Sequence, residues 1–180
     1  MQSRETDMKT IALIRHAKSC WKDSTLPDLD RPLNRRGRIS APEMGRRLQM
    51  QPLFLKRFYS SPAVRSVETA GWLMPCLGLG AMNLEVVPEL YTFNYEDILC
   101  WLRGLDEDAN NFALICHNPA MTDLVNYLTL MKIQKIPTCG VVLLNIDLNC
   151  WADLGAGMAE LAYLDFPKSV TGKTISLGVA

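Results

Sequence analysis

Short apolar runs alternate with longer stretches of helical pattern along most of the chain. Apolar runs that are bounded by polar or turn residues predict buried β-strands, and these lie at about 10–15, 56–60, 84–88 and 112–116. Strands that alternate with helices are typical of proteins with a largely parallel sheet. The pattern therefore predicts an α/β domain.

The first helical segment contains two residues that interrupt helices. In residues 34–50, Gly37 and Pro42 predict a kink or a restart near residue 41. Ser40 and Glu43 support the restart because they have the spacing of a capping box.

Later elements have clearer start and stop signals. Ser61 and Asn118 each stand directly before a proline, which predicts an N-cap followed by proline at the first helical position. Asn94 and Asp97 flank a similar start, and Gly104 predicts the end of that helix. In the last third, "GVVLLNID" and "MAELAYLDF" predict a hairpin or two adjacent edge strands.

Length, charge and cysteine content narrow the class of protein. With 180 residues, 48% of them hydrophobic, we expect one domain over 1–180, with 1–8 and about 168–180 as candidate flexible ends. The 19 basic and 19 acidic residues balance, so nothing points to nucleic acid or an anionic membrane. The N-terminus lacks a signal-peptide pattern, no run reaches the ~18 apolar residues of a membrane span, and the six cysteines form no CxxC pair. We therefore expect a cytoplasmic protein with reduced thiols.

The chain contains only two histidines, and both follow apolar strands. His16 comes after "TIALIR" and His117 after "FALIC", so each lies at the carboxyl end of a predicted strand. Ligands of open α/β sheets bind in the crevice outside these ends. One such histidine is as consistent with a structural role as with chemistry, but two in equivalent places favour a functional site.

Two arginines extend this candidate site. Arg15 ends the first strand, and Arg65 falls in the first turns of the helix after Ser61, where the helix dipole disfavours a cation. A bound anion would reverse that effect, because backbone N–H groups and the guanidinium would both bind it. Arginine binds phosphate oxygens in pairs, and an unprotonated histidine can attack phosphorus. The four residues together therefore predict a site for a phosphoryl group.

Motifs for other chemistries are missing from the sequence. Neither Cys116 nor Cys20 has the arginine six positions later that a cysteine phosphatase needs. No G-x-S-x-G elbow occurs, the "GK" before Thr174 lacks the upstream glycine of a P-loop, and "GLG" at 78–80 follows a helix. Two histidines without a carboxylate cluster make a poor metal site, so we expect no metal or other cofactor.

Three motifs in this order, "LIRHAKS", "SSPAVRSVETA" and "ICHNP", resemble the histidine phosphatase (phosphoglycerate mutase-like) superfamily. "DRPLNRRGR" and the closing "WADL" and "FPK" are similar to its compact SixA-like branch of phosphohistidine phosphatases. The resemblance implies a three-layer α/β/α sandwich, a phosphorylated nucleophile at His16, and a phosphate pocket completed by Arg15, Arg65 and His117. Ala17 replaces the glycine of the usual R-H-G motif, a variant that SixA-like members often have.

Three further residues are candidates for the same site. Many relatives carry a catalytic carboxylate in the loop after the third strand, where "VVPELY" places Glu89. A solvated loop glutamate is an equal alternative for Glu89. Lys18 and Ser19 follow His16 closely enough to touch the phosphate or the substrate, and plain solvent exposure is the equal alternative for both.

The resemblance implies a metal-independent phosphatase that forms a phosphohistidine on His16 and acts on a phosphohistidine protein or a small phosphorylated metabolite. A mutase of the phosphoglycerate mutase type is the alternative among enzymes, although this short chain leaves little material for a lid. A catalytically silent phosphate-binding module is the alternative outside enzymes. All four pocket residues are present, which favours catalysis.

Overall fold

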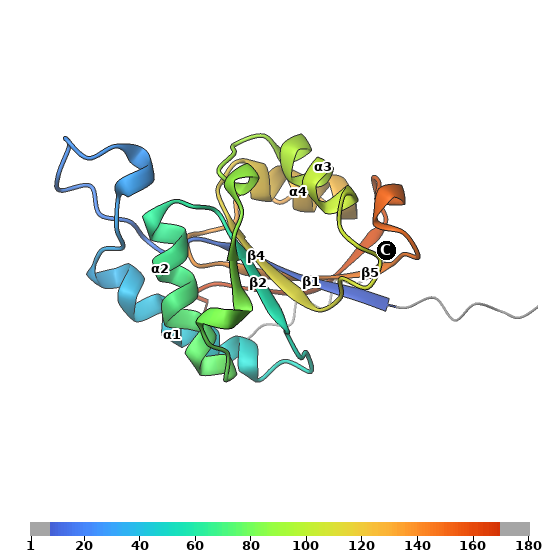
Figure 1. Ribbon diagram of the computed structural model, residues 1–180, viewed down its shortest axis with the longest axis horizontal. Coiled ribbons are helices and arrows are strands. Elements are labelled where there is room, and N and C mark those ends of the chain that lie inside the picture. The colour runs from blue at the N-terminus through green and yellow to red at the C-terminus, as the bar shows by residue number, and fades with distance from the viewer. Residues whose placement is uncertain (1–7, 170–180) are drawn as a thin grey trace, which may run out of the picture.

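The computed structural model describes residues 8–169, whose six strands form one sheet in the order β3-β2-β4-β1-β5-β6 (Figure 1). Strands β1 to β4 are parallel, and β5 is antiparallel to both β1 and β6. The strands are β1 Met8–Arg15, β2 Arg57–Ser60, β3 Leu84–Val86, β4 Phe112–Cys116, β5 Val141–Asp147 and β6 Ala159–Asp165. The α-helices are α1 Arg35–Gln49, α2 Val64–Leu73, α3 Tyr95–Arg103 and α4 Ala120–Thr129.

These elements confirm most of the sequence pattern. All four predicted strands are present, and the two C-terminal runs pair as the antiparallel hairpin of β5 and the edge strand β6. Helix α3 begins after Asn94, whose side chain accepts a hydrogen bond from Glu96 N, and ends before Gly104. The candidate flexible ends fall outside the described residues, except for Met8, which opens β1, and residues 168–169 in a turn after β6.

Helices cover both faces of the sheet. Figure 1 shows α1 and α2 on one face and α3 and α4 on the other. Alternate side chains of β1 point to opposite faces, so Leu13 packs in the cluster under α3 and α4 and Ile14 in the cluster under α1 and α2. Both residues are fully buried. The predicted α/β fold with a largely parallel sheet, arranged as a three-layer α/β/α sandwich, is therefore confirmed.

The predicted restart of the first helix near residue 41 is wrong. Helix α1 runs through Pro42, and its N-cap is Asn34, whose side chain accepts from Gly37 N at 3.0 Å. Ser40 Oγ donates to the Gly37 carbonyl instead of capping a new helix. Gly37 acts by close packing, because a Cβ there would collide with the carbonyl oxygen of Lys18. The glycine thus lets α1 lie against the loop that follows β1.

Two of the predicted N-caps are also wrong. Helix α2 begins three residues after Ser61, whose hydroxyl accepts from Ala63 N and bonds to His117. Asn118 does not cap α4, because its Nδ2 donates to the carbonyl of Ile136. Both side chains are instead used in contacts between segments that are distant in sequence, at the carboxyl edge of the sheet.

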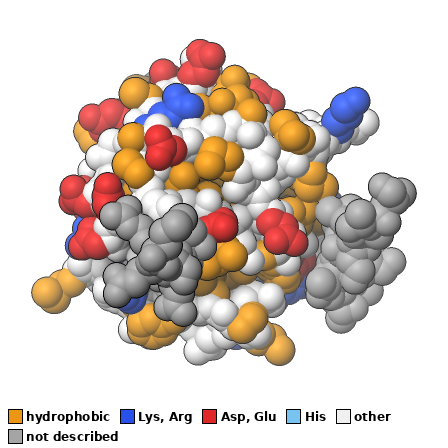
Figure 2. Space-filling model, turned by 90° about the vertical axis from the view of Figure 1, so that its right-hand side faces the viewer, with side chains coloured by type: hydrophobic (Ala, Val, Ile, Leu, Met, Phe, Trp, Pro, Cys, Tyr) orange, Lys and Arg blue, Asp and Glu red, His pale blue; other side chains and the backbone are white. Residues whose placement is uncertain are grey.

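The side of the molecule on which β1 begins, opposite the carboxyl edge of the sheet, presents different side chains. Strand β1 starts on the right of Figure 1, and Figure 2 shows the molecule from that side. Hydrophobic and acidic side chains are interspersed there, and no histidine is visible among the coloured atoms. Within residues 8–169, no helix has both the length and the apolar composition needed to cross a membrane.

Candidate active site

The two histidines lie side by side at the carboxyl ends of adjacent strands. Strands β1 and β4 are parallel neighbours with Arg15 opposite Cys116, so the next residue of each strand is a histidine. The backbone N–H of His16 donates to the Cys116 carbonyl at 3.3 Å. The ring centroids of His16 and His117 are 5.0 Å apart. The strand pairing thus brings both rings to one place.

Arg65 joins the two histidines. It is the second residue of α2 and is only 2% exposed. Its Nε donates to His16 Nε2 at 3.3 Å, and its Nη2 donates to His117 Nδ1 at 3.2 Å. One turn later, Thr69 Oγ1 donates to the Arg65 carbonyl at 2.6 Å and accepts from Ala17 N at 3.0 Å. Thr69 therefore fixes α2 against the loop that carries His16.

Arg15 adds a second guanidinium. Its Nη1 donates to the carbonyl of Ile136 at 2.8 Å, while its Nε is buried and has no hydrogen-bond partner in the part of the chain that the structure describes. Burial lowers the pKa of Arg15, but an arginine remains charged at any working pH. Buried donors normally have a hydrogen-bond partner, so an unpaired buried Nε–H is unusual. A bound oxyanion would supply the partner.

The hydrogen bonds determine the tautomer of His16. Its Nδ1 lies 2.8 Å from the carbonyl oxygen of Ala17. A carbonyl only accepts hydrogen bonds, so Nδ1 carries the proton. The lone pair of the neutral ring is then on Nε2, the nitrogen that faces Arg65. His16 therefore presents a nucleophilic nitrogen next to a guanidinium.

His117 has the opposite arrangement. Its Nδ1 faces the donor Nη2 of Arg65, so in the neutral ring Nδ1 accepts and Nε2 carries the proton. The Nε2–H donates to Ser61 Oγ at 2.7 Å. The rings of Tyr91 and Phe93 pack against His117 with centroid distances of 5.4 and 5.6 Å, which keeps water from it. The predicted cap Ser61 thus orients a ring of the site.

The sequence that carries three of these four residues matches the model of a known protein family. The model of the histidine phosphatase superfamily (branch 1) matches residues 11–99, which contain Arg15, His16 and Arg65. The chain belongs to the histidine phosphatase superfamily. His117 lies beyond the matched residues, and the pairing of β1 with β4 brings it to the others.

Solved structures of proteins related to SixA share the fold of this superfamily member. The SixA protein of Nakamurella multipartitia superposes with a TM-score of 0.75 at 22% identity, covering 90% of this chain and 98% of that one. Protein histidine phosphatase SixA in complex with tungstate gives a TM-score of 0.72 at 22% identity, covering 88% and 97%. These identities show the fold alone, and they confirm the expected phosphoglycerate mutase-like architecture.

A curated relative gives a weaker match by sequence. An uncharacterized chloroplastic protein of Arabidopsis thaliana is 25% identical over 155 residues, which span 81% of this chain and 70% of that protein. The superfamily assignment therefore depends on the family model and the fold, and the relative adds no activity to it.

Burial lowers the pKa of both imidazoles in this superfamily member. Desolvation, assisted by the charges of Arg65, Arg15 and Arg31, lowers the pKa of His16 to about 4, although the hydrogen bond to the Ala17 carbonyl acts in the opposite direction. Desolvation, followed by the charges of His16, Arg65 and Arg15, lowers the pKa of His117 to about 3. Both rings are therefore neutral at pH 7, so Nε2 of His16 carries no proton and keeps its lone pair.

We expect both histidines of the unliganded protein to remain neutral at about pH 5.5, where a free imidazole is mostly charged. The chain has only two histidines, so NMR spectroscopy of their ring protons measures each titration directly. Above about pH 6.5 these rings are neutral in both the folded and the unfolded chain, so they do not change the stability. As the pH falls from about 6.5, only the unfolded chain binds the protons, so stability decreases until the folded pKa values of about 4 and about 3 are reached. Midpoints near 6.5 in the folded protein would contradict the desolvated site.

Asp28 is a site residue that the sequence did not reveal. Its carboxylate accepts from Arg65 Nη2 at 2.7 Å and from the Tyr91 hydroxyl at 2.8 Å, and it also pairs with Arg31. The Asp28 carboxylate thus occupies an N–H group of Arg65 that a phosphate would otherwise bind. Asp28 and Asp30 stand in the same polar loop, and nothing in the sequence distinguishes one from the other.

We expect the substitution Asp28→Asn to strengthen the binding of inorganic phosphate or tungstate. Asparagine keeps the shape but removes the negative charge that competes for Arg65, and a charge-assisted hydrogen bond corresponds to about tenfold in affinity. The inhibition constants of both oxyanions measure the effect. Asp30→Asn is the matched control, because Asp30 contributes no ion pair within residues 8–169. Unchanged or weaker inhibition in Asp28→Asn would show that the carboxylate does not compete with the anion.

The structure leaves the other three candidates outside this cluster. Glu89 is exposed, and no hydrogen bond or ion pair joins its side chain to another described residue. Ser19 is buried in an isolated bridge with Leu33, and its carbonyl accepts from Asn34 Nδ2. Lys18 is exposed and lines a different cavity. Contacts therefore join three of the seven predicted residues, His16, Arg65 and His117. Arg15 belongs with them through its charge, which lowers the pKa of both imidazoles.

Proposed function

We propose that this superfamily member is a metal-independent phosphatase that transfers a phosphoryl group to Nε2 of His16 and then to water. One observation carries the proposal: Nδ1 of His16 is committed to the Ala17 carbonyl, while Nε2 lies 3.3 Å from Nε of Arg65. A phosphoryl group that takes over the N–H groups of Arg65 would therefore be held against the Nε2 lone pair, and such positioning lowers the barrier to attack. Membership of the superfamily and the SixA-like fold support phosphatase activity.

The reaction follows from these contacts in two steps. The Nε2 lone pair forms a bond to phosphorus while the bond from phosphorus to the leaving atom breaks, and the electron pair departs with that atom. Arg15 and Arg65 neutralise the negative charge on the equatorial oxygens. A water oxygen then bonds to phosphorus, the bond from phosphorus to Nε2 breaks, and its electron pair returns to His16. The proton of the water passes to solvent, and orthophosphate leaves.

His117 changes its role when the anion binds. Its Nδ1 accepts from Arg65 in the unliganded site, and the pKa of the ring is low. A phosphate dianion at this position raises the pKa of a neighbouring imidazole, because opposite charges favour the protonated form. The protonated Nδ1–H then donates to a phosphate oxygen, while Nε2 keeps its bond to Ser61.

We propose phosphohistidine proteins as the first substrate class and small phosphoesters as the second. The SixA protein that binds tungstate is itself described as a protein histidine phosphatase. Glu89, the candidate acid, is exposed and makes no contact with the pocket residues within the described chain, so substrates that need little protonation of the leaving group fit this site best. Phosphohistidine is such a substrate.

A substrate panel tests the proposal. Phosphohistidine peptides, phosphoserine peptides and sugar phosphates are compared by release of orthophosphate, with and without a chelator. We expect turnover of at least one class, fastest for phosphohistidine, and no effect of the chelator. Phosphoryl groups that return to a second position of the substrate would identify a mutase. Tight tungstate binding without any turnover would identify a silent module.

Two further expectations become part of this proposal. We infer that residues 1–180 form a single catalytic domain, since the described residues share one sheet. We also propose a reducing compartment such as the cytoplasm, because all six cysteines are free, including the buried Cys116 and Cys139.

A further inference from the structure

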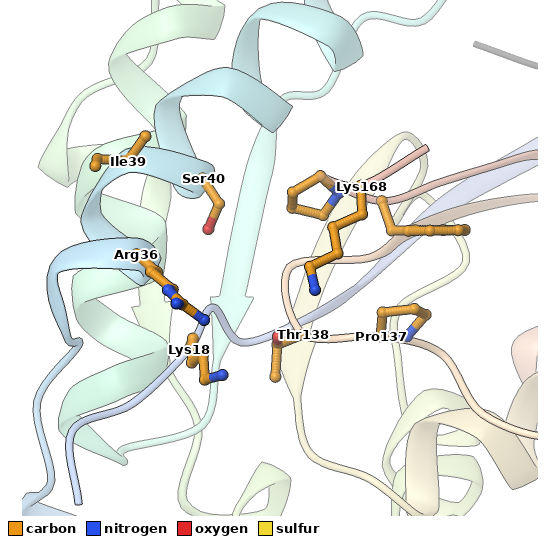
Figure 3. Close-up of a pocket in the computed structure, with 9 residues that line it drawn as sticks. Lys18, Arg36, Ile39, Ser40, Pro137, Thr138 and Lys168 are labelled. Carbon is orange, nitrogen blue, oxygen red and sulfur yellow. The ribbon is translucent and has the colours of Figure 1, made fainter. Parts of the chain in front are cut away.

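A cavity of about 390 Å³ lies beside the catalytic cluster and contains none of its four residues. Its walls are the loop after β1, the first turns of α1, the turn after β6, and the turn before β5. Figure 3 shows Lys18 and Arg36 on one side and Lys168 on the other, with their nitrogen ends directed into the gap. The lining residues are Lys18, Arg36, Ile39, Ser40, Pro137, Thr138, Phe166, Pro167 and Lys168.

All charged side chains that line this cavity are positive. Three of its lining residues are cations and none is a carboxylate. Within residues 8–169, Lys18, Arg36 and Lys168 take part in no ion pair, whereas five other arginines of the same region do. Helix α1 has no acidic residue in its first turn, where the helix dipole favours anions and disfavours cations such as Arg36. An anionic ligand would pair with these cations and would interact favourably with the helix dipole.

The wall that carries Lys168 is held in place by a buried carboxylate. Asp165 is only 1% exposed and accepts from Phe166 N at 2.8 Å, from Tyr163 Oη at 2.8 Å and from Arg47 Nη1 at 3.2 Å. Ser169 also donates to Asp165, and its backbone N–H closes the turn on the Phe166 carbonyl at 2.9 Å. The turn that presents Lys168 is thus anchored at both ends.

Two other walls, the turn before β5 and the loop after β1, adjoin the end of β1 that leads to His16. Cys139 N, next to Thr138, lies 3.0 Å from the carbonyl of Arg15 and 3.1 Å from that of His16. Lys18 is two residues after His16, so their Cα atoms are at most ~7 Å apart. A molecule that places a phosphoryl group at His16 can therefore reach the cavity with a short extension.

We propose that this cavity binds a second anionic group of the substrate, a phosphate or a carboxylate, joined to the reacting phosphoryl group by a short aliphatic or aromatic body. The cations Lys18, Arg36 and Lys168 bind the anion, and the apolar side chains of Ile39 and Phe166 contact the body. The volume is within the range of pockets for small organic ligands. The proposal rests on the proposed phosphatase function and assigns a substrate specificity to it.

A series of substrates of increasing length tests the subsite. Alkanediol bisphosphates with spacers of increasing length are compared with the alkyl monophosphates of the same length. We expect a KM about tenfold lower for the bisphosphate at the spacer length that bridges the two sites, because charge-assisted hydrogen bonds are the strong ones. Bisphosphates that show no advantage at any length would overturn the proposal.

Variants locate the effect in the cavity. The double substitution Arg36→Ala and Lys168→Ala is expected to remove the preference for bisphosphates and to leave monophosphate turnover within about twofold. Arg38→Ala is the matched control, since Arg38 is on the same helix turn, does not line the cavity and pairs with Glu68. A preference that survives the double substitution would place the second anion elsewhere and refute the subsite.

Binding is measured separately from turnover so that the two proposals can fail independently. The methyl signals of Ile39 report on the cavity by NMR when an alkanediol bisphosphate is added to the protein. A shift that the double substitution abolishes supports the subsite, and the absence of any shift at saturating ligand overturns it. The failure of every monophosphate and bisphosphate to be turned over would instead refute the proposed phosphatase.

Discussion

The substitution His16→Ala is expected to abolish turnover, with a loss on the order of 10⁴-fold or more. Nε2 of His16 and Nδ1 of His117 both face Arg65, but His16 is 9% exposed and His117 only 1%, and Nε2 of His117 carries the proton for Ser61. Incubation with a radiolabelled phosphodonor, quenched in alkaline detergent, should trap an alkali-stable, acid-labile phosphoenzyme in the wild type and none in His16→Ala.

The position of the phosphoryl group gives a second, independent readout. Because Nδ1 of His16 donates to the Ala17 carbonyl, we expect the label on Nε2, which phosphorus NMR of the trapped protein distinguishes from Nδ1. His117→Ala is the comparison variant, and it should retain the label because it leaves His16 Nε2 intact. Equal labelling of wild type and His16→Ala would show that another residue is the nucleophile.

Features of the site that depend on local sequence could be predicted well. An apolar run that stops at a histidine places that histidine at a strand end, and this reasoning alone selected His16 and His117. Arg65 was recognised because a cation in the first turns of a helix is unfavourable without an anion. The α/β class could be predicted in the same way, since the alternation of strand and helix patterns is visible in the sequence.

Features that depend on contacts distant in sequence could not be predicted. Asp28 reaches Arg65 across 37 positions, and Ser61 reaches His117 across 56. Ser61 had all the marks of an N-cap, and only the arrangement of β2 beside β4 shows that its hydroxyl orients a histidine instead. Glu89 illustrates the reverse: it stands at the expected place in the sequence, but its side chain is exposed to solvent.

The substitution Arg65→Ala is expected to lower kcat/KM by about 10²–10³-fold, the usual effect of removing one donor that stabilises transition-state charge. Arg65 is 2% exposed, and its three nitrogens donate four hydrogen bonds to His16, His117 and Asp28, all of which alanine removes. Its loss also leaves Asp28 with one cation fewer, which adds repulsion against the phosphate. The inhibition constant of tungstate should rise in parallel, since the bound anion would accept hydrogen bonds from the same guanidinium N–H groups.

Two further variants distinguish the paired N–H geometry of the Arg65 guanidinium from its charge and from the effect of removing any arginine. Arg65→Lys keeps the charge but not the paired N–H geometry, and we expect a kcat/KM between those of wild type and Arg65→Ala. Arg57→Ala removes an exposed arginine at the amino end of β2 and should leave kcat/KM unchanged. Thermal unfolding of each variant checks that the fold is intact, and Arg65→Lys remains informative if Arg65→Ala is unstable. Wild-type kcat/KM in both folded Arg65 variants would mean that the guanidinium between the two histidines does not bind the reacting phosphoryl group.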